Sequence, residues 1–132
     1  MIAAGMASDS QSLTEFRNVD LDLRGDGLEE LLGYLGSSVL VMHQAAQQLS
    51  LELSDSGNDP LDVTLAKWIE LIQSLPEPAR AIWDRCELRS MNIGIQSAEK
   101  PHAALFAISS TTVSELAGLQ AEIALTVYAP HK

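Results

Sequence analysis

Residues 15–23 have the sequence EFRNVDLDL, and this stretch decides the class of fold. Its apolar residues Val19, Leu21 and Leu23 alternate with Asp20 and Asp22. Successive side chains of a β-strand point to opposite faces of a sheet. The alternation therefore predicts a strand that is buried on one face and open to solvent on the other.

Amphipathic helices provide a layer that can cover the buried face. Apolar residues recur at helical spacing in four segments, 28–35, 61–75, 79–86 and 112–119. Gly36 ends the first helix, and Pro76 separates the second from the third. The fourth is expected to open at Thr112, because Glu115 stands three residues further on, at the spacing of a capping box.

Further strands are indicated by the same alternation in 47–53, 89–95, 102–108 and 122–128. The turn-forming residues 97–101 predict a hairpin that joins 89–95 to 102–108. Segment 37–48 suits either a strand or a helix, and we favour a strand that continues into 47–53.

The resulting order of elements is β-α-β-α-α-β-β-α-β. It predicts an α+β fold in which a mostly antiparallel sheet of about five strands is covered by helices on one face. We expect one globular domain over residues 15–130 and a disordered tail over residues 1–14.

The composition excludes several classes of protein. The chain has 132 residues, one cysteine and a formal net charge of −10, and 46% of its residues are hydrophobic. That hydrophobic content is too high for a disordered acidic chain, and one cysteine forms no internal disulfide. The charge argues against binding to nucleic acid or to an anionic membrane. With no leader and no apolar run of membrane-spanning length, we expect a cytoplasmic protein.

The negative charge is concentrated in the first half of the chain. Residues 1–66 contain eleven acidic and two basic residues, whereas residues 67–132 contain seven and six. One interpretation is a solvated face that maintains solubility. The other is a surface that attracts a basic protein partner. The residues expected on such a surface are Asp20, Asp22, Asp26, Glu29 and Glu30.

We predict no catalytic residues, no cofactor and no metal site. A calcium-binding loop that starts at Asp20 fails, because Arg24 and Leu31 occupy positions that need oxygen ligands. Cys86 lies on an apolar helical stripe and is expected in the core. The alternative function is that of a small-ligand-binding domain, with a pocket between sheet and helices. Its candidate polar anchors are Arg85, Arg89 and His102.

The order of short motifs resembles an uncharacterised bacterial family defined only as a domain of unknown function. The residues that carry the resemblance are Leu35-Gly36, Leu75-Pro76, Asn92-Ile93-Gly94-Ile95, Ile108-Ser109, Val113, Leu116-Ala117, Leu119 and Val127-Tyr128. The chain departs from the family pattern after Gly36, where a proline and a glycine-lysine segment are missing. The family has no established catalytic residues that could be transferred to this sequence.

The resemblance implies a non-enzymatic interaction module, either immunity-like or regulatory, since such domains are similar to small acidic proteins of bacterial toxin-immunity systems. The sequence leaves open whether two copies of the chain form a homodimer through a sheet edge.

Overall fold

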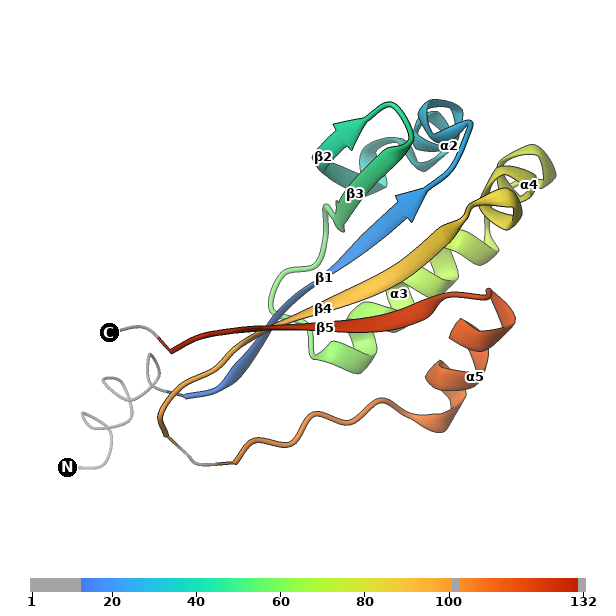
Figure 1. The fold of residues 1–132 in the computed structure, drawn as a ribbon. Coiled ribbons are helices and arrows are strands. Elements are labelled where there is room, and N and C mark those ends of the chain that lie inside the picture. Colours follow the sequence, from blue (N-terminus) through green and yellow to red (C-terminus); the bar gives the residue numbers. More distant parts are fainter. Residues whose placement is uncertain (1–12, 101–102, 131–132) are drawn as a thin grey trace.

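The computed structural model describes residues 13–100 and 103–130 (Figure 1). It shows an α+β fold, as predicted. The strands are β1 (Glu15–Arg24), β2 (Val39–Ala45), β3 (Gln48–Leu53), β4 (Leu88–Gln96) and β5 (Glu122–Tyr128). The helices are α2 (Leu28–Leu35), α3 (Leu61–Gln73), α4 (Glu77–Arg85) and α5 (Ser110–Gly118), and a 3₁₀ turn, η2 (Gly36–Ser38), precedes β2. No helix in these ranges is long and apolar enough to cross a membrane.

The five strands form one open sheet with the order β2-β3-β1-β4-β5. Strand β1 lies at its centre and is antiparallel to both β3 and β4. Only β4 and β5 are parallel, so the chain must cross back between them through α5. The helices lie on one side of the sheet (Figure 1), which leaves the other face open.

The core lies between the sheet and the helices. Leu21 pairs with Leu51 on one side and with Met91 on the other, and all three side chains are fully buried. Two buried tryptophans connect the helices to this core by hydrogen bonds as well as by packing. The indole of Trp68 in α3 donates to the carbonyl of Val19 at 3.2 Å, and that of Trp83 in α4 donates to the carbonyl of Leu119 at 3.0 Å.

Segment 37–53 contains two strands where the sequence predicted one. The preference for a strand over a helix is confirmed for 39–45, but β2 and β3 form a hairpin with a turn at Ala46-Gln47. Strand β2 lies at the sheet edge, and its residues from Leu40 to Ala45 are exposed. With neither face buried, β2 has no apolar alternation that would separate it from β3.

The predicted strand 102–108, and its hairpin with 89–95, is wrong for the described residues 103–108. These residues join no sheet, and the alternation arises because Phe106 and Ile108 pack against the core. Helix α5 also starts earlier than predicted, since Ser109 is its N-cap and accepts a hydrogen bond from the amide of Thr112. The expected tail lies outside the described residues over 1–12.

Substituting the central core residue should destabilise the protein strongly. We expect Leu21→Ala to lower the free energy of unfolding by about 3–5 kcal/mol, because the cavity would open in a fully packed layer. Leu40→Ala is the control. Because Leu40 is 51% exposed, this substitution should lower the free energy of unfolding by less than about 1 kcal/mol. Urea denaturation followed by circular dichroism measures both, and equal losses would contradict this assignment of the core.

Candidate functional site

The open face of the sheet displays the polar residues that alternate with the core residues. On β1 these are Asn18, Asp20 and Asp22, all partly exposed. The strand register places Glu52 of β3 directly opposite Asp20, and Ser50 opposite Asp22. Side chains at directly opposed positions have Cβ atoms about 5 Å apart. The register thus brings three carboxylates, those of Asp20, Asp22 and Glu52, onto one surface.

A single amide group connects two of these carboxylates. The side-chain nitrogen of Asn18 donates to Asp20 Oδ1 at 3.1 Å and to Glu52 Oε2 at 3.2 Å. The space for Asn18 comes from Gly94 on β4, where a Cβ atom would lie 2.5 Å from Asn18 Oδ1. The absence of a side chain at position 94 is therefore what permits this arrangement.

A second set of hydrogen bonds runs across the open face through Asp22. Ser50 Oγ donates to Asp22 Oδ1 at 2.7 Å, and Asn92 Nδ2 lies 3.5 Å from Asp22 Oδ2. Thr126 Oγ1 of β5 donates to Asn92 Oδ1 at 2.8 Å. The network thus connects residues of four strands, and each of its donors is a neutral hydroxyl or amide.

The three carboxylates have no cationic partner among the described residues. The basic residue beside them, Arg24, is instead 3.3 Å from Glu87. Burial, followed by the charges of Glu52 and Asp22, raises the pKa of Asp20 to about 6. The negative charge of Asp20 is therefore held at a cost to folding, because burial and like-charge neighbours both disfavour its ionised carboxyl.

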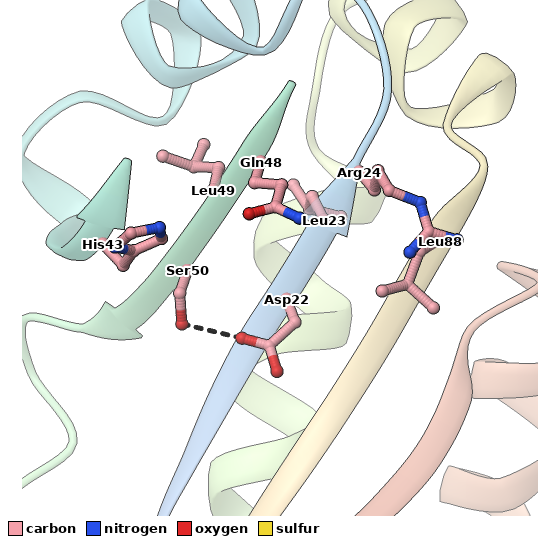
Figure 2. A pocket seen from close by; sticks show the side chains of 8 residues that line it. All are labelled: Asp22, Leu23, Arg24, His43, Gln48, Leu49, Ser50 and Leu88. Atoms are coloured by element: carbon pink, nitrogen blue, oxygen red, sulfur yellow. Dashed lines mark hydrogen bonds between the residues drawn. The ribbon is translucent and has the colours of Figure 1, made fainter. Parts of the chain in front are cut away.

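A hollow of about 200 Å³ lies beside Asp22 on the same face (Figure 2). Its side chains come from four strands, with His43 on β2, Gln48 and Ser50 on β3, Asp22 and Arg24 on β1, and Leu88 on β4. Figure 2 shows the carboxylate of Asp22 at the lower edge of this group, hydrogen-bonded to Ser50, with the guanidinium of Arg24 near Leu88. The hollow has room for a side chain of a partner next to a carboxylate.

The structure divides the five acidic residues predicted for the partner surface. Asp20 and Asp22 lie on the open face, but Asp26, Glu29 and Glu30 lie beyond the end of β1, in the turn and first turn of α2. Asp26 accepts a hydrogen bond from Gln47 Nε2 at 2.6 Å. Sequence reasoning missed Glu52, although its alternation with Leu51 and Leu53 already placed it on the polar face of a strand.

The predicted polar anchors do not form a shared pocket in the described residues. The guanidinium of Arg89 donates hydrogen bonds of 2.7–3.0 Å to the main-chain carbonyls of Trp83, Cys86 and Gln120. It therefore fixes the end of α4 to the start of β5. Arg85 is exposed on α4, and His102 lies outside the described residues.

The described part of the chain contains neither a reactive thiol nor a group of side chains that could bind a metal ion. Cys86 is buried, and burial raises the pKa of its thiol, so the reactive thiolate is disfavoured. No three His, Cys, Asp or Glu side chains among the described residues are grouped to hold a metal ion.

A wider hollow of about 490 Å³ lies between η2, the end of β3 and α3, and it comes nearest to the predicted position between sheet and helices. Four serines and Lys67 contribute to its lining. Lys67 Nζ already lies 2.5 Å from Asp59, and that contact raises the pKa of Lys67. The ammonium group is thus neutralised within the chain, which leaves this hollow without a free cation for an anionic ligand.

Removal of the Asp20 charge should stabilise the protein in a pH-dependent way. Because the pKa of Asp20 is raised from 3.8 to about 6 on folding, its penalty is absent below about pH 4 and complete above about pH 7. Asp20→Asn should therefore raise the unfolding free energy by about 1 kcal/mol at pH 8, a value reduced by the partial exposure of this group, and by much less at pH 4. Thermal unfolding at both pH values measures the difference. Glu30→Gln is the control, and an equal gain in the two variants would argue against a specific penalty at Asp20.

Filling the space at Gly94 should disturb the amide bridge. We expect Gly94→Ala to cost about 1–3 kcal/mol, because the new methyl group would displace Asn18. In an Asn18→Ala background the same substitution should cost less than about 1 kcal/mol, since the obstructed side chain is gone. Chemical denaturation of the unmodified chain, the two single variants and the double variant completes this double-mutant cycle. An unchanged cost in the second background would show that Asn18 is not what the methyl group meets.

Comparison with known proteins adds no relative to this picture. No family model, no curated protein and no solved structure matches the chain. The open face of the sheet, where three carboxylates and a hollow lie together, is therefore the candidate site of function.

Proposed function

We propose that the protein is a non-enzymatic interaction module that binds a basic protein segment on the open face of its sheet. The observation that carries this proposal is the cluster of Asp20, Asp22 and Glu52, which has no ion-pair partner among the described residues. Lysine or arginine side chains of a partner would supply the missing positive charge.

The energetics of the cluster favour binding over a purely structural role. The raised pKa of Asp20 indicates that the folded chain alone disfavours its charge. A cation placed beside Asp20 would reverse that effect, so part of the binding free energy would come from relief of repulsion already present. A charged surface that only maintained solubility would be more stable with its carboxylates spread apart.

The shape of the face supports a segment with long side chains. Asp22 lies at the edge of the hollow, and apolar atoms of Leu88 contribute to its lining. A lysine side chain could lay its apolar stem there and place its ammonium group near the carboxylate. Arg24, the cation at the rim, is occupied by Glu87. An immunity-like or regulatory role in the cytoplasm is one setting in which such a module would work.

Charge-matched variants separate binding at this face from attraction by net charge. The probe is a synthetic peptide of about ten lysines, and fluorescence anisotropy measures its affinity. The variant D20N/D22N/E52Q removes three charges from the open face, and the control D26N/E29Q/E30Q removes three around α2. We expect the first to bind about tenfold more weakly, because three exposed ion pairs of about 0.5 kcal/mol each are lost, and the control to change less than about twofold.

Two further measurements complete this test. Binding of the unmodified chain should weaken as salt is raised, since exposed ion pairs are screened. Amide chemical shifts measured by NMR should change on β1 and β3 when the peptide is added. Equal losses of affinity in the two triple variants would show that the peptide follows net charge alone, and the proposal would then fail.

A further inference from the structure

Strand β5 ends the sheet with an edge that the described part of the chain does not cover. Its side chains Ile123, Leu125 and Val127 point to the helix side of the sheet, in register with the buried Met91, Ile93 and Ile95. They are nevertheless 40%, 62% and 60% exposed, so the described part of the chain leaves much of their apolar surface open to solvent. Regular edges of this kind are templates for pairing with another strand.

The free hydrogen-bonding groups of this edge belong to the same three residues. The carbonyl of Tyr128 accepts from the amide of Ser97, so the main-chain groups of Tyr128 point toward β4. The main-chain groups of successive residues in a strand point to opposite edges. The main-chain N–H and C=O groups of Ile123, Leu125 and Val127 therefore point away from the sheet, along its outer edge.

We propose that β5 is a homodimer interface, in which two copies of this chain pair antiparallel with Leu125 on the twofold axis. In that register Leu125 faces its own copy and Ile123 faces Val127 of the other copy, so about six main-chain hydrogen bonds form between outward-pointing groups. The three exposed apolar side chains of each copy then lie beside those of the other. Glu122 faces Tyr128, so no two like charges are opposed.

The distribution of charge is compatible with a second copy at this edge. Strand β5 contains one charged residue, Glu122, and the carboxylates of the open face begin two strands away on β1. Across the dimer, Asp20 and its copy would be five strand spacings apart, about 24 Å. That separation exceeds the screening length of about 8 Å at physiological salt, so the repulsion between the acidic faces is weak.

The opposite edge of the sheet is less suited to this pairing. Strand β2 also exposes apolar residues, but its pairing with β3 shifts register between Val41 and His43. Irregularities of this kind bend an edge away from a regular ladder. Pairing through β2 would also bring Glu52 within three strand spacings of its copy, about 14 Å. Both differences favour β5 over β2 as the dimer interface.

The mass of the protein in solution tests the interface. Sedimentation or light scattering at about 5–500 µM protein should show a shift from 14.2 kDa toward twice that mass as concentration rises. Leu125→Lys should remain monomeric, because it places two ammonium groups together on the axis. Met42→Lys makes the same change on exposed β2 and should still dimerise. Circular dichroism confirms that both variants are folded.

A cysteine at the axis tests the register itself. In Leu125→Cys the two Cα atoms would lie about 5.5 Å apart, within the range that a disulfide spans, so mild oxidation should link two chains. Met42→Cys should not form this link, and Cys86 is buried. The proposal is overturned if the chain is monomeric throughout, or if Met42→Lys rather than Leu125→Lys abolishes the dimer. It also fails if dimers form only after deletion of residues 1–12, since that segment would then occupy the edge.

Discussion

The structure depends on the alternation of side chains along β1. This strand lies at the centre of the sheet, so its two faces set the character of both layers. Leu21 and its neighbours on one face bind the helices, whereas Asp20 and Asp22 on the other keep the sheet open. A slip of one residue against β3 or β4 would exchange the two sets, and this makes the register of β1 the constraint that all other packing obeys.

The open face shows how a sheet can hold several carboxylates without internal cations. Asn18 connects Asp20 to Glu52, and a chain of neutral donors reaches Asp22 from both sides. The arrangement requires a glycine at position 94 of the neighbouring strand. Neutral donors satisfy the oxygen atoms but leave the net charge in place, so the surface keeps its attraction for a cationic partner.

Local sequence patterns predicted those elements that have one buried face. This holds for β1, α3 and α4, where periodic apolar residues lie against the core. Apolar alternation does not separate β2 from β3, because β2 is exposed on both faces from Leu40 onward, and it wrongly predicts a strand in 103–108, where Phe106 and Ile108 are partly buried without any strand partner. Of the site, Asp20 and Asp22 were found from alternation. The contact of Asn18 with Glu52, 34 residues away in the sequence, depends on the register between β1 and β3, which no local pattern contains.

The central position of β1 has a consequence for how the chain folds. β1 is the first strand of the described residues, yet its partner β4 ends at Gln96, about seventy residues later. At synthesis rates of about 5–20 residues per second, β1 would wait several seconds for that partner to emerge. During this time its apolar side chains would be accessible to other chains, and Asp20 and Asp22 would act as gatekeepers against aggregation. The carboxylate of Asp20, whose charge costs the folded state stability, would thus help to keep the nascent chain soluble.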